Sequence, residues 1–285
     1  MIKTLAVICE DIKIQHTVFA MPFAIMSAFM AADGTPALRV LGLIALAMVF
    51  ARSAAMAFNR IVDAKFDVKN PRTMRRAIPI KLVSQKDYIV FLVVCSLGFI
   101  GVCGAINNLA FILAPLALAI VFFYSYTKRF THHSHFFLGI ALALAPLGAW
   151  VAVREELTYQ PLILGLAVIF WLAGLDIIYS CQDFDFDRQT ELKSTPKKFG
   201  IKNALALAAM FHAVMIILLI VLALVSPLSW VYLTGVAFTA LMLLYEHSLV
   251  KPDDLTKVNV AFFNVNGVIS VGLMVFTIAD ILISS

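Results

Sequence analysis

Charged residues are scarce in this sequence. Asp, Glu, Lys and Arg make up 14% of the 285 residues, whereas a soluble domain usually carries about 25%. Hydrophobic residues make up 62%, and the mean hydropathy is +0.96. This composition argues against an ordinary soluble enzyme and is typical of an integral membrane protein in contact with lipid.

Cysteine is also rare, and the four cysteines show neither a paired framework nor the spacing of a metal site. Cys95 and Cys103 are predicted two turns apart on one helix, which is too far for a disulfide. We interpret the cysteines as packing residues. The amino-terminal stretch MIKTLAVICEDIKIQ is interrupted by charge and is a poor secretory signal, so the first apolar run is expected to stay as a membrane helix.

Long apolar runs dominate what is present. Nine are long enough to cross a hydrocarbon core of about 30 Å, and turn residues such as Asp33-Gly34-Thr35-Pro36 separate most of them. The expected fold is an all-α membrane protein, with nine transmembrane helices in a pseudo-symmetric bundle around a central cavity. The nine segments are approximately 14–32, 38–58, 87–106, 109–127, 135–153, 160–181, 203–225, 228–248 and 259–282.

The distribution of Lys and Arg predicts the orientation. With a cytoplasmic amino terminus, 19 of the 22 basic residues fall on the cytoplasmic side, Arg39 and Arg154 fall outside, and Arg52 lies within the membrane. Nine spans then place the carboxyl terminus outside, as in a bacterial inner-membrane protein. The net charge of +5 is explained by this topology, so we expect no nucleic-acid partner.

The first charged block, NRIVDAKFDVKNPRTMRRAIP, follows the second apolar run. Arg52, Asn59, Asp63 and Asp67 lie within roughly 80° of one another on a helix. One face therefore carries a cation, an amide and two acids. Lys69, Arg72, Arg75 and Arg76 follow downstream.

The second block, DIIYSCQDFDFDRQTELKSTPKK, repeats this plan after the sixth run. Asp176, Tyr179, Asp183 and Asp187 step by three, four and four residues and share one face, whereas Asp185 falls on the opposite face. Asp63 and Asp183 are 120 residues apart. We therefore expect one domain over 1–285, made of two four-helix halves (14–127 and 135–248) and a ninth helix (259–282), with one cavity between the halves.

The two blocks offer oxygen ligands without histidine or cysteine, and this donor set suits Mg²⁺, which is often shared with a phosphate. The adjoining Lys and Arg residues match what a diphosphate needs. An apolar cavity with such a mouth on the cytoplasmic side fits a diphosphate head with a hydrocarbon tail. A polyprenyl diphosphate has this structure.

NRIVDAKFD resembles the first aspartate-rich motif of UbiA-type intramembrane prenyltransferases, and YSCQDFDFD resembles the second. The likeness covers nearly the whole chain. The longer patterns are similar to the branch that prenylates 4-hydroxybenzoate or a dihydroxynaphthoate. Many relatives have Asn-Asp where this chain has Asn59-Arg60, but Arg is frequent at that place in this branch.

The resemblance implies a role for each candidate residue. One Mg²⁺ would be held by Asn59, Asp63 and Asp67, and a second by Asp183 and Asp187. The diphosphate would be contacted by Arg72, Lys128 and Lys193. Tyr124 and Tyr179 would stabilise an allylic cation, Asp176 would orient a phenol or take a proton, and Arg52 would bind the carboxylate of an aromatic acid.

Several alternatives stay open. The acceptor could be 4-hydroxybenzoate, for ubiquinone, or 1,4-dihydroxy-6-naphthoate, for menaquinone, and QDFDFDR is slightly more similar to the second branch. A secondary transporter is the competing class, although its charges are usually near the membrane midplane. Tyr124 and Tyr179 could be interface aromatics. The tract THHSHFF, with His132, His133 and His135, is interpreted as a polar loop.

Overall fold

The computed structural model describes residues 2–12, 20–71, 73–189, 191 and 193–284. Regular structure in these residues is helical apart from one isolated bridge between Lys251 and Asp254. A 3₁₀ turn covers Cys181–Asp183, and a π-helix covers Val260–Val265. The α-helices are α1 (Ile2–Asp11), α2 (Met21–Ala32), α3 (Leu38–Asp67), α4 (Gln85–Ile106), α5 (Asn108–Thr127), α6 (Ser134–Arg154), α7 (Tyr159–Ser180), α8 (Phe184–Arg188), α9 (Thr195–Phe199), α10 (Ile201–Leu224), α11 (Trp230–Leu249) and α12 (Asn266–Ser284).

Seven of the described helical segments are long and apolar enough to cross a membrane: 38–67, 85–106, 108–127, 134–154, 159–188, 201–224 and 260–284. These match seven of the nine predicted spans. The predicted span 14–32 begins outside the described residues, and α2 is a helix of only 12 residues. The predicted span 228–248 coincides with α11, which falls outside this set of seven. The all-helical class is confirmed, whereas nine spans and the orientation of the termini stay predictions.

Turn residues end the helices where the sequence predicted. After α2, Asp33 takes a left-handed conformation (φ 50°), and Gly34 has φ 153°, a region that favours glycine. Between α4 and α5, Asn107 is extended, and its side-chain oxygen accepts from the backbone N–H of Ala110 at 2.8 Å. This contact satisfies one of the amide groups that have no partner inside the helix.

The described helices fall into two compact units. The first unit contains α1, α4, most of α3 and most of α5, and the second contains α2 and α6 to α12. The sequence did not predict α1, because charge interrupts its apolar residues. The predicted division into two four-helix halves stays a prediction, since the units group helices by packing and place α2 with the second group.

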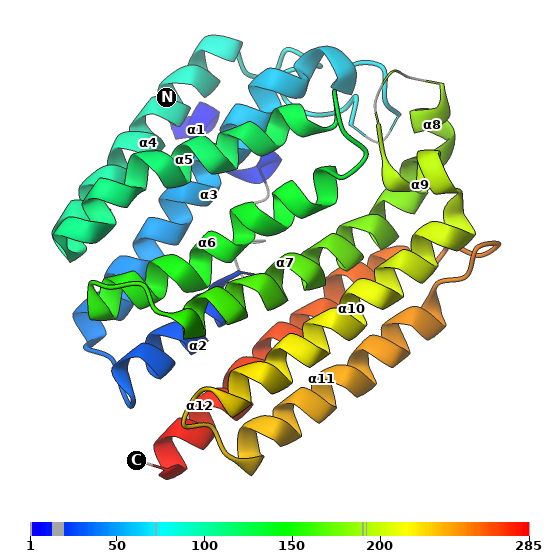
Figure 1. Cartoon of the computed structure of the whole chain (residues 1–285). Helices are drawn as coiled ribbons and strands as arrows, with labels where there is room; N and C mark the ends of the chain where they lie inside the picture. Colours follow the sequence, from blue (N-terminus) through cyan, green and yellow to red (C-terminus); the bar gives the residue numbers. More distant parts are fainter. Residues whose placement is uncertain (1, 13–19, 72, 190, 192, 285) are drawn as a thin grey trace. The chain divides into compact units, whose positions relative to one another are not determined.

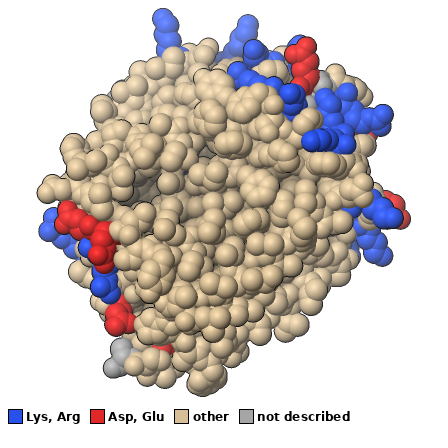
Figure 2. Space-filling view, in the orientation of Figure 1, with Lys and Arg blue, Asp and Glu red and all other residues tan. Residues whose placement is uncertain are grey.

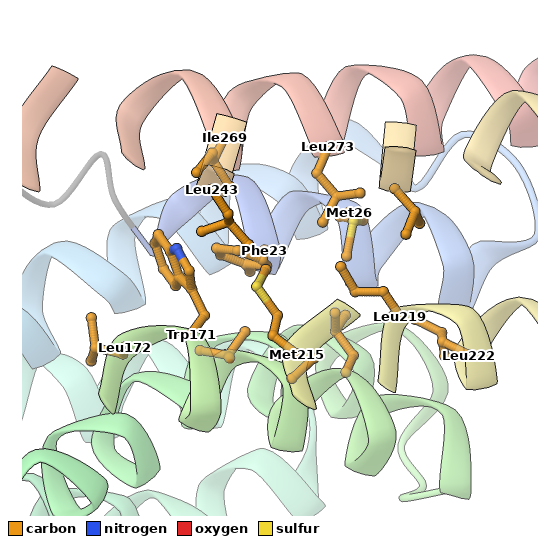
Figure 3. Packing of buried hydrophobic residues seen from close by; sticks show 14 of the residues in the cluster. Phe23, Met26, Trp171, Leu172, Met215, Leu219, Leu222, Leu243, Ile269 and Leu273 are labelled. Atoms are coloured by element: carbon orange, nitrogen blue, oxygen red, sulfur yellow. The ribbon is translucent and has the colours of Figure 1, made fainter. Parts of the chain in front are cut away.

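The core of the second unit is centred on Trp171 of α7 (Figure 3). The Trp171 ring packs against Phe23 of α2 with centroids 4.9 Å apart. Met215 of α10 and Ile269 of α12 belong to the same buried cluster. Four helices therefore converge on one aromatic side chain, and truncation of such a residue costs about 3–5 kcal/mol of folding free energy.

The core of the first unit is divided into smaller clusters. One joins Ile8 and Ile12 to Tyr88 of α4, and another gathers around Ala54, Cys95 and Leu118. Much of this unit's apolar surface faces outward, as expected for helices in contact with lipid.

Small residues allow α6 and α7 to approach closely, and these helices run side by side (Figure 1). A Cβ added at Gly139 would lie 2.7 Å from the carbonyl oxygen of Ile169. One turn further along α6, Ala143 lies against Gly165. Close backbone contact at small residues is the usual way in which helices associate in a membrane, and here it fixes the register of α6 on α7.

Charged side chains are few on the face of the molecule drawn in Figure 2. They gather near the margins of that face, and its broad middle is uncharged. This pattern is expected for a surface in contact with hydrocarbon, where an exposed charge is costly.

Candidate active site: two acidic motifs

The first acidic motif occupies the last turns of α3. Asn59 Nδ2 donates to Asp63 Oδ2 at 2.8 Å and to Ser125 Oγ of α5 at 3.4 Å. The spacing of four residues places Asn59 and Asp63 on one face, as the sequence predicted. The Asn59 amide nitrogen meets the Asp63 carboxylate, and the two side chains together carry amide and carboxylate oxygens, the ligand types that Mg²⁺ prefers.

Asp67, the last residue of α3, has a partner that the sequence did not single out. Both of its carboxylate oxygens accept from Arg76 Nη1 at 2.8 Å, and the Asp67 side chain is 7% exposed. Arg76 belongs to the basic segment that follows the motif. Removing one member of a buried ion pair leaves the other charge uncompensated, so Arg76 holds the end of this motif in place.

A second ion pair in the first unit joins α1 to α3. Arg60 Nε donates to Asp11 Oδ2 at 3.0 Å, and the two side chains are 5% and 11% exposed. Asp11 also accepts from the Tyr88 hydroxyl at 2.6 Å and from the Ala77 backbone N–H at 3.1 Å. Arg60 Nη1 donates to Asn59 Oδ1 at 3.3 Å. The network therefore reaches the first motif, but Asp11 is 49 to 77 residues from its three partners in sequence, a distance that helical spacing cannot reveal.

Arg52 lies about two turns before Asn59 on α3. Its Nε atom is buried and has no hydrogen-bond partner among the residues that the structure describes. A buried N–H without a partner costs about 1–3 kcal/mol, and a ligand is one common explanation for such a group. The predicted role of Arg52, binding a carboxylate, would give this atom an acceptor.

The second acidic motif begins in the last turns of α7 and ends in α8. A 3₁₀ turn at Cys181–Asp183 joins the two helices. Asp176 and Asp187 are buried, Asp183 is half-buried and Asp185 is exposed. The prediction that Asp185 points away from the other acids therefore agrees with the structure.

Basic residues gather around Asp187. The charges of Lys128 and Lys197 stabilise its carboxylate, Asp183 opposes it with a like charge, and Ser194 forms a side-chain hydrogen bond with it. Lys197 is a further basic residue near Asp187. The sequence analysis had assigned it only a role in membrane topology. Arg72, predicted to contact a diphosphate, lies outside the described residues.

The segment after α8 is tied to the connection between α5 and α6. The Lys193 backbone N–H donates to the Lys128 carbonyl at 2.9 Å, and Lys193 Nζ donates to the Phe130 carbonyl at 3.1 Å. Thr195 Oγ1 donates to the His132 carbonyl at 2.9 Å. The structure thus brings together Lys128 and Lys193, which are 65 residues apart in the sequence.

His135 pairs with Asp176. Its Nδ1 lies 2.6 Å from Asp176 Oδ2, and the two side chains are 1% and 12% exposed. The sequence interpretation of the histidine tract as a polar loop holds for His133, which is exposed. It is wrong for His135, which is buried in the first turn of α6. No spacing rule links positions 135 and 176, so this pair could be found only from the packing of α6 on α7.

Tyr179 lies against two aromatic rings of the π-helix. Its ring centroid is 4.3 Å from that of Phe262 and 6.2 Å from that of Phe263. A π-helical turn inside a longer helix is frequent at functional sites. Tyr124, the other predicted tyrosine, is half-buried in α5 of the first unit.

Each unit thus contains one acidic motif. Within the described residues, no group of three or more His, Cys, Asp or Glu side chains forms a metal cage. The candidate ligands are Asn59, Asp63 and Asp67 in the first motif, and Asp183 and Asp187 in the second. Such open sets of oxygen donors fit Mg²⁺, because this ion usually keeps several waters and binds one or two carboxylates together with phosphate oxygens.

Most of the chain matches a known protein family. The UbiA prenyltransferase family model matches residues 20–268. A 4-hydroxybenzoate octaprenyltransferase of Vibrio atlanticus is 32% identical over 253 residues, which is 87% of this chain and 88% of that protein. The same enzyme of Aliivibrio fischeri is 32% identical over 84% of this chain and 83% of its own length.

Two solved structures extend the comparison to the fold. The apo structure of a UbiA homologue from Aeropyrum pernix superposes with a TM-score of 0.85, at 32% identity over 94% of this chain and 99% of that one. A homologue from Archaeoglobus fulgidus, bound to GPP and Mg²⁺, has a TM-score of 0.76 at 19% identity and covers 96% of this chain and 99% of its own. The second likeness concerns the fold alone.

The helices and the paired acidic motifs define a class of integral membrane enzyme. Within that class, the chain belongs to the UbiA prenyltransferase family. It is a prenyltransferase, and it resembles the 4-hydroxybenzoate octaprenyltransferases of several bacterial species.

Proposed function

We propose that this prenyltransferase moves a polyprenyl group from a polyprenyl diphosphate to the ring of an aromatic acid, 4-hydroxybenzoate, in quinone biosynthesis. The observation that supports an aromatic acid as the acceptor is Arg52. Its buried Nε atom has no partner among the described residues, and a carboxylate on the ring would supply one. The names of the bacterial relatives support 4-hydroxybenzoate as that acid.

The diphosphate end of the donor would bind at the acidic motifs. Asn59, Asp63 and Asp67 would hold one Mg²⁺, and Asp183 and Asp187 a second. Asp67 would exchange part of its contact with Arg76 for the ion. The bound ions would neutralise charge on the leaving diphosphate.

Basic side chains would contact the diphosphate oxygens directly. Lys128 and Lys193 are held together by the backbone hydrogen bond between them, and Lys197 acts on the same carboxylate as Lys128. Arg72 is proposed from the sequence alone. Lysine and arginine suit this role because they donate several charge-assisted hydrogen bonds to phosphate oxygens.

The chemical step would proceed by ionisation followed by substitution on the ring. The bond between prenyl C1 and oxygen breaks, and its electron pair leaves with the diphosphate. A ring carbon ortho to the hydroxyl supplies the electrons of the new C–C bond. The ring C–H bond then returns its electrons to the ring, and the proton passes to Asp176. Tyr124 and Tyr179 would stabilise the allylic cation with their ring faces, and an apolar cavity would keep water from it.

The site would face the cytoplasm of a bacterial inner membrane, because most Lys and Arg residues fall in the connections on that side. Both substrates would then be reached from the compartment that makes them, with the prenyl tail in contact with membrane lipid.

A turnover assay in detergent tests the proposal. Purified protein is given Mg²⁺ and geranyl diphosphate with either 4-hydroxybenzoate or 1,4-dihydroxy-6-naphthoate, and Asp183→Ala serves as the blank. We expect a prenylated product from 4-hydroxybenzoate. Product from the naphthoate alone would overturn the acceptor and keep the chemistry. No product from either acid, with folded protein, would overturn the proposed function and favour a transporter.

A further inference from the structure

The contact between His135 and Asp176 is defined by the packing of two helices. His135 and Gly139 are four residues apart on α6, so they share one face of that helix. Gly139 lies against the backbone of Ile169, which is seven residues, or about two turns, before Asp176 on α7. The close approach at Gly139 therefore brings the start of α6 against the last turns of α7, where His135 meets Asp176.

The hydrogen-bond geometry indicates which nitrogen of His135 carries the proton. Nδ1 lies 2.6 Å from a carboxylate oxygen, so Nδ1 is the donor. Nε2 is buried without a hydrogen-bond partner among the described residues. The contact with Asp176 therefore fixes the orientation of the buried His135 ring.

A histidine held against a carboxylate has a definite effect. One oxygen of Asp176 is engaged by His135 Nδ1, so the side chain is restricted to one orientation. Enzymes commonly orient a reacting carboxylate or imidazole through a partner of this kind. Tyr179, one turn after Asp176 on α7, places this pair next to the proposed cation site.

We propose that His135 is a positioning residue for the acceptor half-reaction. It holds Asp176 in the orientation in which the carboxylate meets the acceptor's hydroxyl group and takes the ring proton. This inference rests on the proposed function and adds a residue to it. His135 itself contacts neither substrate and acts through Asp176.

A double-mutant cycle tests the proposal with the full-length protein in detergent. The four proteins are wild type, His135→Leu, Asp176→Asn and the variant that carries both changes. We expect His135→Leu to lower kcat about 100-fold, because small misplacements of a reacting group have effects of this size. The KM for geranyl diphosphate should stay unchanged. In the Asp176→Asn background, His135→Leu should have no further effect on kcat, since a residue that acts through Asp176 has nothing left to position.

Two further variants separate positioning from packing. His135→Asn keeps a side-chain N–H donor near the position of Nδ1, and we expect it to restore most of the kcat lost in His135→Leu. His133→Leu changes an exposed histidine two residues away and should leave kcat unchanged.

Every outcome is informative about His135. The proposal is overturned if the fold-losses in kcat of His135→Leu and Asp176→Asn multiply in the double variant. A folded His135→Asn protein that is as inactive as His135→Leu also overturns it. If His135→Leu fails to fold, the kcat of His135→Asn alone decides. Absence of wild-type turnover with any aromatic acid would overturn the proposed function and this inference together, whereas an additive cycle in an active enzyme overturns the inference only.

Discussion

The two acidic motifs follow the same sequence plan but are supported in different ways. In the first, Asp67 is engaged by Arg76, and the Asp11–Arg60 pair borders Asn59. In the second, Asp176 is held by His135, and Asp187 by Ser194 and nearby lysines. The first motif is therefore supported by two arginine ion pairs, and the second by a histidine, a serine hydroxyl and the charges of two lysines.

The difference follows from the surroundings of each motif. The first unit has small apolar clusters, and its amino-terminal helix and the loop after α3 are joined through Asp11. In the second unit, α7 belongs to a large buried cluster that includes Trp171. Close packing fixes the position of that helix, whereas the Asp11 and Asp67 ion pairs join segments of the first unit.

Substitution of the proposed metal ligands should have the largest effect. Asp63→Ala and Asp183→Ala should each lower kcat by at least about 1000-fold, because stabilisation of the leaving group would be lost. The thermal unfolding temperature in detergent should hardly change. Asp185→Ala, on the exposed side of α8, is the matched control and should keep its activity. An active Asp63→Ala protein would mean that only the second motif binds the diphosphate.

Loss of Arg76 should have the next largest effect, and this effect would be on stability. Arg76→Ala leaves Asp67 buried without its partner, which destabilises a protein by about 3 kcal/mol or more. Arg75→Ala removes an exposed arginine from the adjacent position and should have little effect. Chemical unfolding of the two variants, monitored by circular dichroism, gives the comparison. Equal stabilities would show that the first motif does not depend on its arginine pair.

Arg52 should affect the acceptor more than the donor. A charge-assisted hydrogen bond contributes about 1.5–3 kcal/mol, so Arg52→Ala should raise the KM for 4-hydroxybenzoate roughly 10- to 100-fold. The KM for geranyl diphosphate should change little. Steady-state kinetics with each substrate varied in turn separates the two. A rise in donor KM alone would assign Arg52 to the diphosphate instead of the carboxylate.

Ser194 should have the smallest effect. Its side chain contacts Asp187 and accepts from the Lys197 backbone N–H at the start of α9. Ser194→Ala should destabilise the protein by about 1 kcal/mol, the usual value for loss of an N-cap. Ser248→Ala, which removes only a hydroxyl bonded within its own helix, is the control. If Ser194→Ala destabilises the protein as much as Arg76→Ala does, the two motifs do not differ in how much their supporting contacts contribute to stability.

Periodicity predicted much of the fold, because long apolar runs and turn residues are local signals. Seven predicted spans coincide with apolar helices, and Asp33-Gly34 ends α2 as expected. Helix α1 was missed because charge interrupts its apolar pattern. It is held in place by Asp11, whose partner Arg60 is 49 residues away.

The candidate site could be predicted only where its residues share a helix. Asn59 and Asp63 meet at a spacing of four, and the burial of Asp183, Asp185 and Asp187 follows the predicted faces. The partners Arg76 and His135 were not assigned to the site. His135 meets Asp176 because α6 packs on α7 at Gly139, and tertiary contacts of this kind leave no periodic trace in the sequence.

We propose that both acidic motifs bind the same diphosphate. Equilibrium binding of geranyl S-thiolodiphosphate, an analogue whose leaving group ionises slowly, tests this proposal. Binding is measured with and without Mg²⁺ for wild type, Asp63→Asn and Asp183→Asn. We expect Mg²⁺-dependent binding by the wild type and a large loss in each variant. Full binding by either variant, or wild-type binding that is independent of Mg²⁺, would overturn the proposal.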